Sequence, residues 1–298
     1  MANDLSAFNA QLWSKSLIAN LDQMNVMMDK VNREFEGDLD GLGDTVKVRT
    51  LGSVSSGSYA KGQTIQYQDI TPVVESFQVN DAIYAAINVD DIDAIQNDIN
   101  GLNAYTGRLA VEMNNQVEAK ILSMYASAHA DNQITNGGSA IALTSTTAGT
   151  SVYDNFVQAR ENLALKNVPP TMRKWAIVSP KVTSLLLKDT THFIRSTTLG
   201  DAVTMRGTVD GQAPRPGYVG MCAGFEVYES NVLPTNSTNK YILYGTDMAI
   251  AYAAQLQTVE AIRRPDTFAN AVRVLLLHDA KVFAETSKML GYIYASNA

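Results

Sequence analysis

The stretch that decides the fold is GDTVKVRTLGSVSSGSYAKGQTIQY, residues 43–67. Its first part alternates apolar and charged side chains through residues 46–50, a pattern typical of a half-buried β-strand. Small residues fill positions 52–62, and residues 64–67 are predicted to be the return strand of a long hairpin. Two strands with so little apolar surface are marginally stable in water on their own. We therefore expect this hairpin to lie across another subunit.

The next segment is predicted to contain the longest helix in the chain. Residues 73–89 look extended, and Asp90 and Asp91 then supply the acidic groups that favour a helix start. Helical spacing persists for roughly 40 residues, about 60 Å of helix. Gly101 and Gly107 interrupt the apolar stripe, and either bending or close packing of a neighbour explains a glycine there. The stripe consists of Ile92, Ile95, Ile99, Leu102, Leu109, Met113, Val117, Ile121 and Met124.

Residues 12–36 are predicted to form an amphipathic helix. The apolar residues are spaced by three or four through Val31 and Phe35, which places them on one stripe opposite a polar face. Because an isolated helix of this length is marginally stable in water, the stripe must dock on this chain or on a neighbour. We expect its first part to pack against an assembled shell through Trp13, Leu17, Leu21, Met24 and Met28.

The second half of the chain reads as a mixture of short helices and strands. Ser151 and Asp154 form a capping-box pattern for a helix that runs to Leu165, and Pro180 suits the first turn of another helix. Residues 196–217 read as a loop, and residues 280–295 as extended or mixed. Strands are expected at 175–178, 225–228, 241–244, 248–252, 258–262 and 271–277.

Composition and charge exclude several classes of protein. The chain has 298 residues and a formal net charge of −7, which argues against a dedicated basic face for nucleic acid. Residues 1–149 carry 8 Lys and Arg against 18 Asp and Glu, whereas residues 150–298 carry 15 against 12. This asymmetry either favours contacts between unlike surfaces of two copies or is simply a solvated acidic surface. Cys222 is the single cysteine, so an intrachain disulfide is excluded. Because a signal peptide and an 18-residue apolar run are both missing from the sequence, we expect a soluble protein made in a cytoplasm.

The motifs of common enzymes are incomplete. The glycines at 52 and 57 have the outer spacing of a phosphate-binding loop, but Ser58 stands where that motif needs lysine. The three histidines, His129, His192 and His278, contain no pair at helical metal-binding spacing. We therefore predict no enzyme activity, cofactor or metal, although a hydrolase whose triad assembles in space remains an alternative.

The order of these parts resembles the major capsid proteins of tailed bacteriophages. Three motifs carry the resemblance: residues 43–67 resemble an extended loop, NVDDIDAIQ at 88–96 resembles the entry to a spine helix, and GYVGMCAGFEVYESNVLP at 217–234 resembles a strand leaving an axial loop. The resemblance implies an α+β fold with five parts. These are an N-terminal arm at 1–36, an extended hairpin loop at 37–89, a peripheral domain with the spine helix at 90–151, an axial domain at 152–262, and a return to the peripheral domain at 263–298.

The resemblance also implies a function. Such a protein is a structural subunit that assembles with itself, as hexamers and pentamers, into an icosahedral shell around double-stranded DNA. It implies a virion protein assembled in the host bacterial cytoplasm, with a separate scaffolding protein, a portal and a decoration protein as partners and no membrane. Lys47, Arg49 and Lys61 of the hairpin are then expected to contact the neighbouring subunit. An encapsulin, which shares the fold but encloses cargo protein, is the main alternative.

Overall fold

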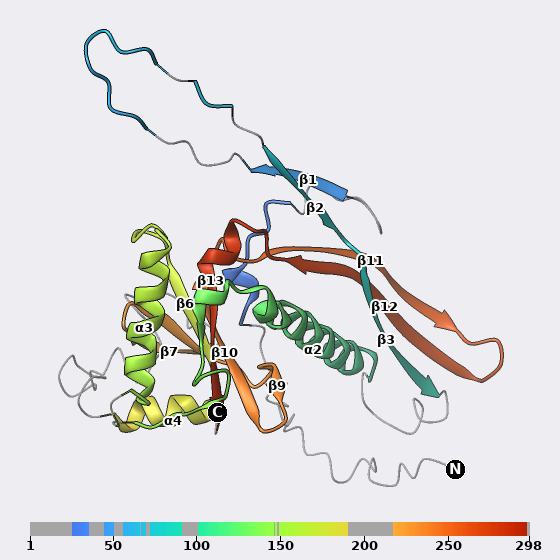
Figure 1. Cartoon of the computed structure of the whole chain (residues 1–298). Coiled ribbons are helices and arrows are strands. Elements are labelled where there is room, and N and C mark those ends of the chain that lie inside the picture. The colour runs from blue at the N-terminus through green and yellow to red at the C-terminus, as the bar shows by residue number, and fades with distance from the viewer. Residues whose placement is uncertain are drawn as a thin grey trace, which may run out of the picture.

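The computed structural model describes residues 26–35, 45–50, 56–65, 67–69, 72–90, 101–145, 147, 149–189 and 217–296. Figure 1 shows a body built around two β-sheets, from which a long hairpin projects. The described part of the chain mixes helices with many strands, as expected for an α+β protein.

The first sheet has eight strands in the order β4-β13-β10-β6-β8-β7, with β5 also paired to β13 and β9 to β10. Strand β10 lies at its centre and pairs antiparallel with both β13 and β6, while β6 pairs parallel with β8. The strands are β4 (Gln133–Ile134), β5 (Ile141–Ala142), β6 (Lys174–Val178), β7 (Tyr218–Cys222), β8 (Phe225–Glu229), β9 (Thr235–Asn236), β10 (Asn239–Thr246) and β13 (Leu290–Ser296).

Two helices pack on this sheet through fully buried side chains. They are α3 (Val152–Leu165) and α4 (Pro180–Lys188), and Phe156, Leu163 and Val182 lie with the sheet residues in one core cluster. The Ser151 hydroxyl accepts a hydrogen bond from the Tyr153 amide at 3.2 Å and caps α3. Ser179 caps α4 in the same way, and Pro180 occupies its first turn as predicted.

The second half of the predicted capping box is wrong. The Asp154 carboxylate accepts a hydrogen bond from the Gly149 amide at 3.0 Å, whereas a capping box would have it accept from the amide of the N-cap residue Ser151.

The second sheet has three antiparallel strands in the order β11-β12-β3. They are β3 (Asp81–Asp90), β11 (Ala251–Arg263) and β12 (Ala269–Lys281). Helix α2 (Gly101–Leu122) lies alongside this sheet (Figure 1). Val117, Ile121 and Leu122 of α2 share one core cluster with residues of both sheets, so the helix packs between them.

The end of the long helix differs from its prediction, whereas its predicted start falls on residues outside the described part of the chain. Strand β3 continues to Asp90, residues 91–100 lie outside the described part of the chain, and α2 is described from Gly101. The α-helix ends at Leu122 and is followed by the 3₁₀ turn η4 (Ser123–Ser127). Met124 therefore lies beyond the α-helix that it was predicted to complete.

The predicted N-terminal helix does not extend through Phe35. A 3₁₀ turn, η2 (Met28–Lys30), is followed by extended backbone, because Asn32 pairs with the start of β11. The Asn32 amide donates to the Ile250 carbonyl at 2.8 Å, and the Tyr252 amide donates to the Asn32 carbonyl at 2.9 Å. These bonds take the backbone groups that a helix would use. The rest of the predicted stripe, Trp13, Leu17, Leu21 and Met24, lies outside the described residues.

The return strand of the hairpin was predicted too early. Strand β1 (Thr45–Thr50) pairs antiparallel with β2 (Val73–Gln78), in a register that sets Thr50 opposite Val73. The described residues of 64–67 are not in a strand. The observed pairing buries Phe77, which is 1% exposed, whereas Tyr67 is 92% exposed. Burial of an aromatic ring therefore selects the later partner.

The strand connections cross the predicted division of the chain. The expected boundary at 262 falls within the β11–β12 hairpin, one residue before β11 ends. The returning segment supplies β12 to the second sheet and β13 to the first. The division into peripheral and axial domains itself stays a prediction.

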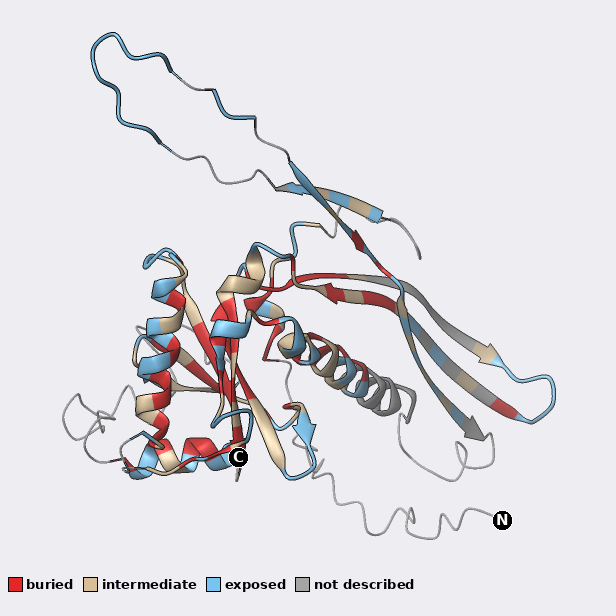
Figure 2. Ribbon diagram, in the orientation of Figure 1, coloured by how far each residue is buried: buried red, intermediate tan, exposed pale blue. Residues whose placement is uncertain are grey.

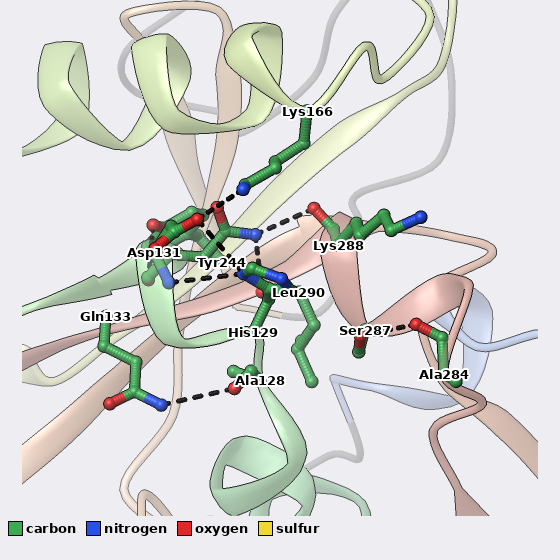
Figure 3. A network of polar contacts seen from close by, with 11 residues as sticks. Ala128, His129, Asp131, Gln133, Lys166, Tyr244, Ala284, Ser287, Lys288 and Leu290 are labelled. Atoms are coloured by element: carbon green, nitrogen blue, oxygen red, sulfur yellow. Dashed lines mark hydrogen bonds and ion pairs between the residues drawn. The ribbon is translucent and has the colours of Figure 1, made fainter.

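A network of polar contacts joins β13 to the turn after α2 (Figure 3). The Asn132 side-chain amide donates to the carbonyls of Lys288 and Leu290, at 2.7 and 3.0 Å. The Tyr244 hydroxyl donates to the Asn132 carbonyl at 2.7 Å. Tyr244 lies directly opposite Gly291 in the β10–β13 register, and its ring fills the space where a larger residue would place a side chain.

We predict that Gly291→Ala destabilises the protein. The added Cβ atom would lie 2.3 Å from Tyr244 Cζ and 2.6 Å from the Asn132 carbonyl oxygen, so the ring or strand β13 must shift. We expect a loss of about 1–3 kcal/mol in the free energy of unfolding, measured by urea denaturation. Gly57→Ala is the control, because no atom lies within 4 Å of the added Cβ there. Equal stability of the two variants would contradict the close contact.

Candidate assembly surface

The projecting hairpin is fixed to the body by three phenylalanine rings. Phe77 of β2 packs against Phe35 and Phe283, with ring centroids 6.2 and 6.5 Å apart and edge-on geometry. Phe35 and Phe283 also contact each other, at 5.8 Å. The rings come from the N-terminal segment, the hairpin and the chain after β12, so the hairpin root joins three distant parts of the sequence. We call these residues the phenylalanine root.

Polar contacts reinforce the phenylalanine root. The Glu75 carboxylate accepts a hydrogen bond from the Ala284 amide, with its two oxygens at 3.1 and 3.2 Å. The Lys281 ammonium donates a hydrogen bond to the Ser76 carbonyl, and its nitrogen lies 5.6 Å from the centre of the Phe283 ring. The base of the hairpin is therefore held by apolar ring contacts and also by hydrogen bonds to backbone groups.

Strand β1 presents two different faces. Val46 and Val48 pack against the phenylalanine root, whereas Lys47 and Arg49 point the other way and are exposed, because side chains alternate along a strand. Lys61 is also exposed, in the turn at residues 61–62. Within the described residues, these three cations form no ion pair. The structure thus leaves all three predicted contact residues available to a second molecule.

The described residues in the outer part of the hairpin are exposed (Figure 2), and several of them are apolar. Its tip has a local turn, in which the Gln63 side chain accepts from the Ala60 amide at 3.2 Å. Clusters of exposed apolar residues on soluble proteins usually mark interaction sites. The exposed fractions are 67% for Tyr59, 61% for Ile65, 92% for Tyr67, 54% for Val73 and 51% for Val74.

Gly101 and Gly107, the predicted bend points, both lie in α2. Gly101 is its first described residue, and the helix runs without interruption through Gly107 to Leu122. A difference in bending between copies of the chain therefore stays a prediction.

Sequence reasoning missed how the N-terminal segment is attached to the body. The buried Glu118 carboxylate of α2 accepts hydrogen bonds from the Val26 amide at 3.2 Å and the Ser230 hydroxyl at 2.6 Å. Lys30 donates to the Val26 carbonyl at 2.7 Å and lies 3.7 Å from the centre of the Tyr228 ring. Burial, aided by nearby Arg173, lowers the pKa of Lys30 to about 8, and burial raises the pKa of Glu118.

These two charged residues gave no signal in the sequence, because each occupies an ordinary polar position of a helical pattern. Their burial depends on contacts with residues that are far away in the chain. Met28, the one described residue of the predicted N-terminal contact stripe, packs at the edge of the same core cluster. It therefore contributes to holding the segment on the body of its own chain.

Two further observations bear on the site. The described residues contain no group of three His, Cys, Asp or Glu side chains that could hold a metal ion. Of the helices that are described, none combines the length and the apolar character needed to cross a membrane.

We predict that Phe77→Ala loosens the hairpin root. Truncation of a buried phenylalanine costs about 3–5 kcal/mol in protein cores. We expect amide hydrogen exchange in residues 45–50 and 73–78 to accelerate strongly, while exchange in α3 is unchanged. Val74→Ala in the same strand is the control, since Val74 is 51% exposed. Unchanged exchange in Phe77→Ala would show that the root does not hold the hairpin.

The comparisons with known proteins agree with this geometry. A chain from Mycobacterium phage Che8 superimposes with a TM-score of 0.71 at 24% identity, covering 94% of this chain and 95% of that one. The capsid of the cyanophage P-SCSP1u gives a TM-score of 0.68 at 15% identity, covering 96% and 92%. An encapsulin complex from Synechococcus elongatus gives 0.52 at 10% identity, covering 75% and 76%. At these identities the likeness establishes the fold alone.

Among curated protein sequences, none matches this chain. A family model described as "Phage capsid protein" matches residues 82–287, more than half of the chain. The match covers α2, nearly all of β3 and every strand from β4 to β12, and it ends before β13. The chain belongs to the phage capsid protein family.

Proposed function

We propose that this protein is the major capsid protein of a tailed bacteriophage. Copies of the chain assemble into hexamers and pentamers that close an icosahedral shell around double-stranded DNA, so that the protein resides in the virion. Family membership supports this proposal most directly. The role is structural, and the chain acts by binding copies of itself.

The projecting hairpin supplies a physical reason for assembly. Its root is buried in its own chain, but its outer part exposes three large side chains, Tyr59, Ile65 and Tyr67. Each large apolar side chain that becomes fully buried gains about 1.5–3 kcal/mol. Because the hairpin and the surface that receives it are different parts of the chain, the contact is heterologous, the type that forms rings when the rotation between neighbouring copies closes. The hairpin therefore contributes to the contact between neighbouring subunits.

The charges of the chain suit a container for DNA. A net charge of −7 gives little attraction for phosphates, so a wall of such subunits encloses DNA without binding it tightly. Lys47, Arg49 and Lys61 then act between subunits, on the exposed side of the hairpin, and not on nucleic acid.

The first experiment is to express the chain alone and together with candidate scaffolding protein, and to measure particle mass by light scattering and electron microscopy. We expect closed shells of megadalton mass. A monomer or small oligomer under every condition would overturn the proposal. Nucleic acid inside native particles identifies a capsid, whereas an enclosed enzyme identifies an encapsulin, for which the similarity to the Synechococcus elongatus complex is the observation in favour.

We predict that Lys61→Glu impairs assembly, because it reverses the charge of an exposed residue near the hairpin tip. An intersubunit ion pair at such a site is worth about 0.2–1 kcal/mol, and a charge reversal replaces attraction by repulsion in every copy. The yield of shells at increasing salt is the measurement, since salt should restore the variant. Lys61→Arg keeps the charge and is the matched control. If Lys61→Glu gave the wild-type yield of shells at low salt, the charge of Lys61 would make no contribution to assembly.

A further inference from the structure

His278 occupies an unusual position in the second sheet. It is 1% exposed, and neither ring nitrogen has a hydrogen-bond partner among the described residues. In the β12–β3 register it lies opposite Asp81, and its ring packs against Tyr252 of β11 with centroids 6.1 Å apart. A neutral imidazole contains one donor and one acceptor, and burying both unsatisfied is costly.

The charged groups around His278 are already paired with one another. The Lys120 ammonium of α2 lies 3.1 Å from an Asp81 oxygen and 3.2 Å from an Asp279 oxygen. The two Asp279 oxygens also accept from the amides of Asn80, at 3.3 Å, and Ala280, at 2.8 Å. This cluster joins α2, β12 and the point where β2 passes into β3. It therefore lies at the base of the projecting hairpin.

We propose that protonation of His278 weakens the contact between α2 and the base of the hairpin. We call His278, Lys120, Asp81 and Asp279 together the joint. While the ring is neutral, the ion pairs of Lys120 with Asp81 and Asp279 stay intact. A proton on the ring adds a second cation beside Lys120, and the imidazolium must then compete with Lys120 for Asp81 and Asp279. Any rearrangement that hydrates the imidazolium or brings it to a carboxylate loosens the contact of α2 with β3 and β12. The hairpin base then gains freedom to move relative to the helix.

The direction of the pH effect follows from the surroundings of the ring. Burial lowers the pKa of His278, with a smaller contribution from Lys120, while Asp81 and Asp279 act in the opposite direction. The neutral ring therefore contributes its full stability above about pH 6.5, the unfolded value for histidine. That contribution is lost as the pH falls through the lower folded value. The hydrogen bond from Lys120 lowers the pKa of Asp81, so this carboxylate stays ionised over the same range.

The joint is tested by amide hydrogen exchange on the full-length chain, corrected for intrinsic rates, at about pH 7.5 and about pH 5.5. We expect local opening of residues 73–90 and 113–122 to increase severalfold at the lower pH in the wild type. His278→Leu, which fills the site with a side chain that does not titrate, should abolish the increase. His129→Gln removes a partly exposed histidine outside the joint and should retain it. The same increase in His278→Leu, or no increase in the wild type, would overturn the proposal.

A second measurement does not depend on any variant. Deuterium exchange at the imidazole C2 position, followed by mass spectrometry against pH, reports the titration of individual histidines in assemblies of any size. We expect His278 to exchange slowly and to titrate below pH 6.5. Titration at or above that value would show that the folded protein does not disfavour the protonated ring, and the joint would be excluded. Neither measurement requires shell formation, so their outcome is independent of the proposed capsid function.

Discussion

The pairing of β13 with β10 is the constraint on which the remaining architecture depends. The chain leaves the first sheet after Thr246, builds β11 and β12 of the second sheet, and returns at Leu290 to lie beside β10. The last strand of the first sheet therefore follows β11 and β12 of the second sheet in the chain. The return requires Gly291, since the Tyr244 ring and the Asn132 carbonyl occupy the space of any larger residue. This close contact lies within the first sheet, where it holds β13, β10 and the turn before β4 together around the fully buried Tyr244 ring.

The hairpin divides into a part that its own chain stabilises and a part that it does not. The phenylalanine root supplies apolar burial, the Glu75 carboxylate binds the Ala284 amide beside it, and β1 and β2 pair from Thr45–Gln78 to Thr50–Val73. Beyond the strands, the exposed Tyr59, Ile65 and Tyr67 gain nothing from the chain to which they belong. Ordering a long segment costs about 1–2 kcal/mol per residue in backbone entropy. A neighbouring subunit that covers these side chains offsets that cost, which links the final order of the hairpin to assembly.

Local signals in the sequence were sufficient to predict the helices that begin with a capping residue and the strand that is a continuous apolar run. Ser151, Ser179 and Pro180 mark real helix starts, and the apolar run at 175–178 is strand β6. The errors occur where a distant contact decides between two locally acceptable choices. Residues 64–67 and 73–78 are both strand-like, and contacts with distant residues, above all the rings of Phe35 and Phe283, favour the second. The helical spacing through Phe35 is real, but pairing with Ala251 pulls that backbone into an extended form. Neither partner is visible from a window of the sequence.

The two charged residues near the end of α2 explain how this helix holds both sheets at once. Glu118 and Lys120 are two positions apart, about 200° around the helix, and so face nearly opposite sides. Glu118 is bonded to Val26 and Ser230 on the side of the first sheet, whereas Lys120 is bonded to Asp81 and Asp279 on the side of the second. Apolar contacts alone tolerate small sliding movements of a helix. The buried Glu118 carboxylate does not, because displacement leaves it without its hydrogen bonds at a cost of several kcal/mol. The contact of Lys120 is partly exposed and adds a weaker constraint, because solvent screens it. A change of charge on either side of α2 therefore acts on the geometry between the sheets, and His278 lies beside one of these two contacts.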